Sequence, residues 1–292
     1  MATFTTGDIP PMNGGTVIVT GANSGVGRSA AHALAAAGAH VVLAVRSVGK
    51  GKEAAAGMPG STEVRELDLA DLSSVRAFAA GWEGPIDLLI NNAGTSAPSL
   101  TRTSDGFEST FGVNHLGHFA LTNLLAGHLT GRVVTVASQA ERMARLDLDD
   151  PNWQRRPFQS SRAYADSKLA NVLFTAELQR RLTAAGSGVL AQAAHPGLVA
   201  TAIYDRGERS VSNSLWKLAV KLLAQNSDQG ALPVLYAAVA DVPGNSFAGP
   251  SHLAHMRGAP ELIPRSATAQ DPAVAARLWT VSEQLTGVGF PA

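Results

Sequence analysis

Short apolar runs alternate along the chain with segments in which apolar residues recur at helical spacing. Continuous runs rich in β-branched residues are typical of strands that are covered on both faces. The pattern predicts strands over residues 16–20, 40–45, 64–69, 86–90, 132–138 and 189–194. It predicts helices from the end of the first strand to about residue 38, over 72–82 and 104–129, and through 164–168 to about 185.

This regular alternation of strands and helices predicts an α/β domain with a parallel sheet. Each right-handed crossover returns its helix to a face of the sheet, so helices cover both faces. In such folds, ligands bind outside the carboxyl ends of the strands, near the point where the strand order reverses. No linker interrupts the 292 residues, so we predict a single domain over residues 1–292.

Composition narrows the possible partners of this domain. Hydrophobic residues make up 45% of the chain and charged residues 16%, which suits a protein with a sizeable core. The chain has no cysteine, which excludes disulfides and thiolate metal sites, and its histidines lack the spacing of a metal site. Lys+Arg 23 balance Asp+Glu 23, so no net charge attracts nucleic acid or anionic lipid. We expect small-molecule partners.

The N-terminal residues 1–15 contain no basic region followed by an apolar run, which is the pattern of a signal peptide. No later stretch approaches the length of a membrane span. We therefore expect a cytoplasmic protein without a membrane anchor.

A glycine-rich turn, TGANSGVG over residues 20–27, joins the first strand to the first helix. Without side chains at Gly21, Gly25 and Gly27, the backbone can turn sharply and aim N–H groups at a pyrophosphate. The context of strand, turn and helix favours nucleotide binding over a purely structural turn. Arg46 follows the second strand, where dinucleotide folds place an acidic residue for ribose hydroxyls or an arginine for a 2′-phosphate. For Arg46 we prefer the phosphate role.

Polar residues also follow the later strands at their carboxyl ends. Asp68 ends the third predicted strand, although it could simply begin the next helix. The NNAG segment over residues 91–94 follows the fourth strand, and Ser138 ends the fifth. Asn114 lies in the middle of a predicted helix, where it is either a structural polar group or a site residue. These residues would meet at one edge of the sheet.

Tyr164 and Lys168 lie four residues apart on a predicted helix, so their side chains share one face. A tyrosine titrates near pH 10, and a neighbouring cation favours its phenolate. The pair is therefore a candidate acid/base for proton exchange. Spacing alone also fits an ordinary surface pair, so the interpretation depends on the other motifs.

Together these motifs resemble the short-chain dehydrogenase/reductase family over roughly the whole chain. The resemblance rests on the 20–27 turn, Asp68-Leu69, NNAG at 91–94, Asn114, Ser138, Tyr164 with Lys168, and Pro196-Gly197. NHLGH at 114–118, SKLAN at 167–171 and LWTVSEQLTG at 278–287 are similar, more narrowly, to the retinol dehydrogenase-like and protochlorophyllide reductase-like branch. The family implies a Rossmann-type doubly wound domain, with a mostly parallel seven-stranded sheet flanked by helices on both faces.

The resemblance also implies roles for individual residues. Tyr164 would exchange a proton with the substrate oxygen, Lys168 would lower the Tyr164 pKa, and Ser138 would hydrogen-bond that oxygen. Asn114 would hold a water in a proton relay. With Arg46, the expected cofactor is NADP(H). The residues expected to bind it are Gly21, Asn23, Ser24, Gly25, Val26, Gly27, Arg46, Asp68, Leu69, Asn91, Ala93, Gly94, Tyr164, Lys168, Pro196, Gly197, Val199 and Thr201.

By the same analogy, the substrate pocket would lie between a loop over about 139–160 and a lid over about 202–226. A C-terminal segment over about 245–292 would pack on the domain. Gln139 and Tyr204 are the candidate substrate contacts, and aromatic neighbours such as Trp153 suit a small hydrophobic carbonyl or alcohol. Whether the protein is a homodimer or a monomer stays open.

The leading hypothesis is an NADPH-dependent enzyme that interconverts a carbonyl and an alcohol. A second hypothesis is a catalytically silent NADP(H)-binding regulatory protein, which would have no physical need for Ser138, Tyr164 and Lys168 together. A third is a non-redox lyase or epimerase on the same fold. Such relatives usually have a larger C-terminal substrate domain, for which the residues after Gly230 leave little room.

Overall fold

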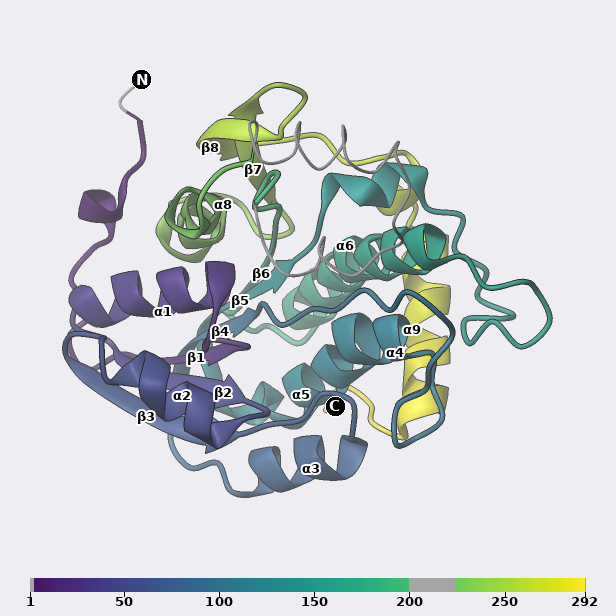
Figure 1. Ribbon diagram of the computed structural model, residues 1–292, viewed down its shortest axis with the longest axis horizontal. Coiled ribbons are helices and arrows are strands. Elements are labelled where there is room, and N and C mark those ends of the chain that lie inside the picture. The colour runs from purple at the N-terminus through teal and green to yellow at the C-terminus, as the bar shows by residue number, and fades with distance from the viewer. Residues whose placement is uncertain (1–2, 200–223, 292) are drawn as a thin grey trace.

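An eight-stranded sheet forms the centre of the computed structural model, which describes residues 3–199 and 224–291 (Figure 1). The order across the sheet is β3-β2-β1-β4-β5-β6-β7-β8. Neighbouring strands are parallel from β3 to β7, and β8 joins β7 antiparallel. The strands are β1 (Thr16–Thr20), β2 (His40–Val45), β3 (Ser61–Glu66), β4 (Ile86–Asn91), β5 (Leu129–Val136), β6 (Leu190–Ala194), β7 (Phe247–His252) and β8 (Arg257–Leu262).

The predicted α/β fold with a mostly parallel sheet is confirmed, with one strand more than the expected seven. The eighth strand, β8, lies at the edge of the sheet and has the sequence RGAPEL. Most of its residues are partly or fully exposed, so they do not produce the apolar run of a covered strand. An edge strand of this kind leaves little signal in the hydrophobic pattern.

The third strand begins three residues earlier than the pattern indicated. Its partner β2 pairs along its whole length with β3, from His40 with Ser61 to Val45 with Glu66. β3 forms the edge of the sheet opposite to β8, and its first three residues are polar, so they leave no apolar run in the sequence. The predicted end was too late, because Asp68 turns the chain by accepting the Ala70 N–H at 2.9 Å.

Helices cover both faces of the sheet (Figure 1). Side chains from α1, α2 and α8 pack on one face, and those from α3, α5 and α6 pack on the other, with α9 lying against α6. The helices are α1 (Gly25–Ala36), α2 (Val48–Ala55), α3 (Leu72–Ala80), α4 (Ser109–Phe111), α5 (Gly117–Leu124), α6 (Ser160–Ala184), α8 (Ser227–Val239) and α9 (Pro272–Thr286). Short 3₁₀ turns are η1 (Thr6–Asp8), η3 (Ala126–His128), η4 (Gln139–Met143) and η5 (Thr268–Gln270), and η2 (Gly112–Leu116) is a π-helical turn.

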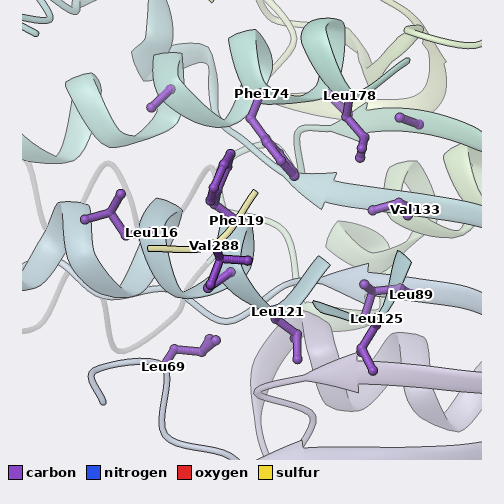
Figure 2. Packing of buried hydrophobic residues seen from close by; sticks show 14 of the residues in the cluster. Leu69, Leu89, Leu116, Phe119, Leu121, Leu125, Val133, Phe174, Leu178 and Val288 are labelled. Atoms are coloured by element: carbon purple, nitrogen blue, oxygen red, sulfur yellow. The ribbon is translucent and has the colours of Figure 1, made fainter. Parts of the chain in front are cut away.

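The larger core lies between the sheet and α5 and α6. Figure 2 shows Phe119 of α5 and Phe174 of α6 in this cluster, together with Val133 from β5. The ring centroids of Phe119 and Phe174 are 5.8 Å apart, and Trp279 of α9 stacks on Phe174 at 5.7 Å. The C-terminal helix is thereby fixed on the helix that carries Tyr164. Among the described helices, none is both long and apolar enough to cross a membrane.

The long helix expected over residues 104–129 is shorter and interrupted. It begins at Ser109, because the Glu108 carboxylate accepts the N–H groups of Thr110 and Phe111, both at 2.7 Å. A π-helical turn then separates α4 from α5, and the helical stretch ends before β5 begins at Leu129. π-helical turns inside helices occur frequently at functional sites, and this one contains Asn114.

Strand order reverses between β1 and β4. From β1 the chain proceeds to β2 and β3 on one side, whereas β4, β5, β6 and β7 follow on the other. The glycine-rich turn follows β1, and the NNAG segment follows β4, so both lie at the reversal point. This is the position where open α/β sheets bind their ligands.

Candidate active site

The glycine-rich turn fits closely against the segment that follows β4. A Cβ on Gly21, whose φ is +66°, would lie 3.0 Å from the Ala93 Cβ. A Cβ on Gly27 would lie 2.3 Å from Asn92 Nδ2 and 2.8 Å from the Gly21 carbonyl oxygen. Side chains at these positions would therefore separate the two segments. The glycines are required for this close approach, which the sequence did not predict; their expected contact with a pyrophosphate stays a prediction.

The first helix starts at Gly25, directly after the turn. Its N-cap residue is Ser24, and no side-chain hydrogen bond from Ser24 caps the helix. The first turn of the 12-residue helix α1 thus presents backbone N–H groups beside the reversal point. Such a helix end favours a bound phosphate, because the N–H groups and the helix dipole both attract negative charge. Asn23, Ser24 and Val26 belong to the same turn.

Thr20 joins the two segments by hydrogen bonds. Its Oγ1 accepts the N–H groups of Asn92 and Ala93, both at 2.9 Å, and Asn92 Nδ2 donates to the Thr20 carbonyl oxygen at 2.8 Å. Asn91, the predicted cofactor contact, instead turns its buried side chain inward and donates to Thr122 Oγ1 at 2.9 Å. A contact from Asn91 to a cofactor would thus involve its backbone.

Thr20 and Asn92 are positioning residues that sequence reasoning did not assign. The available signal was the alternation of side chains along a strand. Asn91 is the last residue of β4 and faces inward, so the adjacent Asn92 faces the glycine-rich turn.

Arg46 is exposed at the end of β2, where the sequence places a phosphate contact. It takes part in none of the ion pairs between described residues. Ser47 follows as the N-cap of α2, and its side chain makes no capping bond. Lys50 and Lys52 are exposed on α2. Arg46 directly follows the carboxyl end of β2, which pairs with β1.

Asp68 and Leu69 form the wall on the β3 side. The Asp68 carboxylate is occupied by the Ala70 N–H, so it shapes the turn that Leu69 continues. A Cβ on Gly117 would lie 2.6 Å from the Leu69 carbonyl oxygen. The absence of a side chain at Gly117 lets the loop approach α5 directly.

Lys168 places a buried ammonium group at the centre of the site. Only 3% of the residue is exposed, and Nζ donates to the Val136 carbonyl oxygen at 3.0 Å. Nζ lies 5.6 Å from the centroid of the Tyr164 ring, as the four-residue spacing on α6 predicts. Burial lowers the pKa of Lys168 to about 8, because the charged form is poorly solvated there. A cation with this pKa can exchange protons near neutral pH.

Asn114 lies on the π-helical turn and is fully buried. Its Nδ2 donates to the Thr95 carbonyl oxygen and to Ser167 Oγ, both at 3.0 Å, and its Oδ1 accepts the Thr95 N–H at 2.8 Å. A Cβ on Gly94 would lie 3.5 Å from Asn114 Oδ1 and 3.7 Å from Lys168 Nζ. The side chain therefore fixes the loop after β4 beside Lys168, and a role in a proton relay stays a prediction.

Ser138 lies two residues beyond Val136, whose carbonyl group holds Lys168. It is the N-cap of η4, and its Oγ accepts the Ala140 N–H at 3.2 Å. The next residue, Gln139, accepts a hydrogen bond from Arg142 through Oε1 at 2.8 Å. Its buried Nε2 has no hydrogen-bond partner among the described residues. Gln139 thus retains an unused donor beside Ser138.

The segment after β6 packs against the turn between β7 and β8. Gly197 has a φ of +80°, and a Cβ there would lie 2.5 Å from the Met256 carbonyl oxygen, in the turn between β7 and β8. Val199 is buried. A Cβ on Gly230 would lie within 3.2 Å of the Cγ2 atoms of both Val199 and Val26. The segment from Pro196 to Val199 is thereby placed beside the glycine-rich turn. Thr201, Tyr204 and nearly all of the predicted lid lie outside the described residues.

The loop after Ser138 is fixed to α6 by charged side chains. Arg156 pairs with Asp150 at 3.7 Å and with Asp166 of α6 at 3.8 Å, and its guanidinium lies 3.9 Å from the Trp153 ring centroid. Trp153 is only 4% exposed and packs edge-on against Phe158. This aromatic pair therefore forms the interior of the loop. Trp153 is therefore buried inside the loop and does not present the open surface expected for a substrate contact.

Comparison with known proteins agrees with this geometry. The sequence profile described as short chain dehydrogenase matches residues 15–210. The chain belongs to the short-chain dehydrogenase family. It is similar to human retinol dehydrogenase 13, with 43% identity over 298 aligned residues that cover 95% of this chain and 86% of the relative. It is therefore an oxidoreductase of the retinol dehydrogenase-like branch, as the motifs indicate.

Solved structures of the family have the same architecture. An uncharacterized protein from Mycobacterium paratuberculosis is 50% identical, with a TM-score of 0.89 over 100% of both chains. A second structure is titled as an NAD(P)-dependent gluconate 5-dehydrogenase from Beutenbergia cavernae with bound NADP at low occupancy. It is 28% identical, with a TM-score of 0.60 over 78% of this chain and 92% of its own. The fold of this short-chain dehydrogenase is thus shown.

Proposed function

We propose that this short-chain dehydrogenase is an NADPH-dependent enzyme that interconverts a carbonyl and an alcohol on a small hydrophobic substrate. The observation that carries the proposal is the buried Lys168 ammonium, 5.6 Å from the Tyr164 ring, at the sheet edge that also carries the glycine-rich turn. A buried cation favours the phenolate form of a neighbouring tyrosine. Tyr164 is thereby suited to general acid/base catalysis.

The protein's own groups divide the work at the substrate oxygen. Tyr164 donates a proton to the carbonyl oxygen during reduction and accepts one from the alcohol during oxidation. Ser138 hydrogen-bonds the same oxygen and stabilises the negative charge that grows on it. Lys168 holds its positive charge against the phenolate, and the Val136 carbonyl group keeps its Nζ in place. Asn114 keeps the loop after β4 beside Lys168.

The residues at the reversal point fit a dinucleotide. The glycine-rich turn and the uncapped first turn of α1 would hold the pyrophosphate, and Gly94 leaves room beside Asn114 and Lys168 that a Cβ would occupy. Arg46 would pair with a 2′-phosphate, which supports NADP(H) as the cofactor. When bound, the nicotinamide supplies or accepts the hydride of the reaction.

The substrate is proposed to be apolar around its reacting carbon. Gln139 Nε2, which has no partner among the described residues, would donate to a polar atom of the substrate beside Ser138. Human retinol dehydrogenase 13 is named for a hydrophobic alcohol, which supports the same substrate class for this chain. Tyr204 remains a proposed contact.

The proposal is tested by replacing the Tyr164 hydroxyl. Tyr164→Phe should reduce kcat with a hydrophobic aldehyde by about 10²–10⁴-fold, the usual range for loss of an acid/base group, while NADPH binding stays measurable. Tyr236→Phe is the matched control, because Tyr236 lies on α8, where its ring packs on Phe4. Turnover is measured as the loss of NADPH absorbance with each of a series of aldehydes, ketones and quinones.

Undiminished activity of Tyr164→Phe would remove Tyr164 from the acid/base role. Tight NADPH binding without turnover of any carbonyl would favour the silent regulatory hypothesis. Conversion of a substrate without net oxidation or reduction of the cofactor would favour the lyase or epimerase hypothesis.

A further inference from the structure

A buried histidine joins the glycine-rich turn to the π-helical turn at Asn114. His118 lies on α5 and is 1% exposed. Its Nε2 is 2.9 Å from Thr20 Oγ1, and its Nδ1 is 3.0 Å from the Asn114 carbonyl oxygen. This side chain takes no part in the proton and hydride transfer proposed above.

The direction of each hydrogen bond follows from the partners. Burial is the main cause that lowers the pKa of His118 to about 4, and the nearby Lys168 charge lowers it further, so the ring is neutral at pH 7. A neutral imidazole has one donor and one acceptor. The Asn114 carbonyl group can only accept, so Nδ1 carries the proton and Nε2 accepts from the Thr20 hydroxyl.

Thr20 is satisfied on all sides by this arrangement. Its Oγ1 accepts the N–H groups of Asn92 and Ala93 and gives its single proton to His118, in preference to the Ile90 carbonyl oxygen at 3.4 Å. The chain of hydrogen bonds therefore runs from the loop after β4, through Thr20 at the start of the glycine-rich turn, to Asn114. The two links made by His118 are buried and those from Asn92 and Ala93 are partly buried, and an unsatisfied polar group is costly in such surroundings.

We propose that His118 is a positioning residue that sets the glycine-rich turn against the π-helical turn at Asn114, and so aligns the cofactor pyrophosphate site with Lys168. The inference rests on the proposed function, since it assigns the turn to NADP(H). His118 contacts neither reacting atom. It acts through Thr20 on one side and through the Asn114 carbonyl group on the other.

The chain supplies a matched control in the neighbouring turn. His115 is equally buried and lies three residues away, and its Nε2 contacts Ser282 Oγ at 2.8 Å on α9, away from the glycine-rich turn. His118→Phe should raise the NADPH Kd about tenfold, the value of one buried hydrogen bond, and lower kcat at saturating NADPH. His115→Phe should lower Tm but leave the NADPH Kd at the wild-type value.

His118→Asn separates the two arms. An asparagine on α5 can donate to the carbonyl group four residues earlier, as Asn123 Nδ2 does to Phe119 at 2.8 Å, but it is too short to replace the ring at Thr20. This variant should show the same rise in Kd as His118→Phe but a smaller loss of kcat at saturating NADPH, because only the contact with Thr20 is lost. Adding Thr20→Val to His118→Phe should raise the Kd further, because valine also removes the Oγ1 that accepts the Asn92 and Ala93 N–H groups.

Binding is measured by NADPH fluorescence titration and folding by thermal denaturation, so neither readout needs turnover. Equal Kd values for wild type and for folded His118→Phe or His118→Asn would overturn the positioning role. Equal losses of NADPH affinity in the His115 and His118 variants would show a purely structural effect and overturn it as well. Failure of the wild-type protein to bind NADPH would instead refute the proposed function.

Discussion

Replacement of Lys168 by methionine should stabilise the protein while it removes the proposed catalytic cation. Burial lowers the pKa of Lys168 from its usual 10.5 to about 8, which corresponds to a destabilisation of about 3 kcal/mol at neutral pH. The variant loses the hydrogen bond to the Val136 carbonyl group, worth about 1 kcal/mol. Asn171 Nδ2 still donates to that carbonyl oxygen at 3.1 Å. We therefore expect Lys168→Met to gain roughly 2 kcal/mol at pH 7.

The pH dependence of this gain has a definite sign. Between pH 8 and 10.5, the unfolded wild-type chain binds more protons at Lys168 than the native state does, so wild-type stability rises with pH relative to the variant. The gain should be complete below about pH 8 and should vanish near about pH 10, above which the lost hydrogen bond leaves the variant less stable. Urea unfolding without cofactor at pH 7, 8, 9 and 10 measures it, with Lys50→Met on the exposed face of α2 as the control.

A Lys168→Met variant that is less stable than wild type at pH 7 would contradict this reasoning. A stability difference between the variant and wild type that does not change between pH 7 and 10 would contradict it as well. In the first case the ammonium would be better solvated in the native protein than its 3% exposure indicates.

Two further substitutions test the cofactor side of the site. Arg46→Asp should shift the preference toward NADH in steady-state kcat/KM, because a carboxylate accepts ribose hydroxyls and repels a 2′-phosphate; equal NADPH and NADH efficiency in the wild type would already refute the assignment. Gly27→Ala should weaken NADPH binding and destabilise the fold by about 1–3 kcal/mol, because its Cβ would lie 2.8 Å from the Gly21 carbonyl oxygen. Gly127→Ala, where no atom lies within 4 Å of a Cβ, is the control in titration and thermal denaturation, and equal losses in both variants would contradict the steric explanation.

The sequence was most informative where one residue type is required by a close contact or a buried strand. The apolar runs of β1 and β2 predict both strands at their observed bounds, because each is covered on both faces. Gly21 and Gly27 could be singled out from the strand, turn and helix around them, and the structure adds that a side chain at either position would collide with Ala93 or Asn92. These features leave direct patterns in the chain.

Features that depend on distant partners could not be predicted in this way. The π-helical turn between α4 and α5 contains Asn114, whose partners Thr95 and Ser167 lie on other elements. Likewise, nothing in the local sequence distinguishes His118, which contacts Thr20, from His115, which contacts Ser282. Both are histidines three residues apart on one helical stretch. Their partners differ because His115 faces α9, whereas His118 faces the end of β1.

The buried polar groups of this site show why the acid/base pair needs so much of the chain. The surroundings of Lys168 disfavour its charge. Without hydrogen-bond partners, the ammonium group would lose its proton or turn toward water. Its position depends on the Val136 carbonyl group, which Asn171 also contacts, and on the loop after β4, which Asn114 fixes. That loop is in turn tied by Thr20 to the glycine-rich turn. Loss of any one of these hydrogen bonds should therefore alter both the pKa of Lys168 and the cofactor site, although the bonded residues lie on different elements.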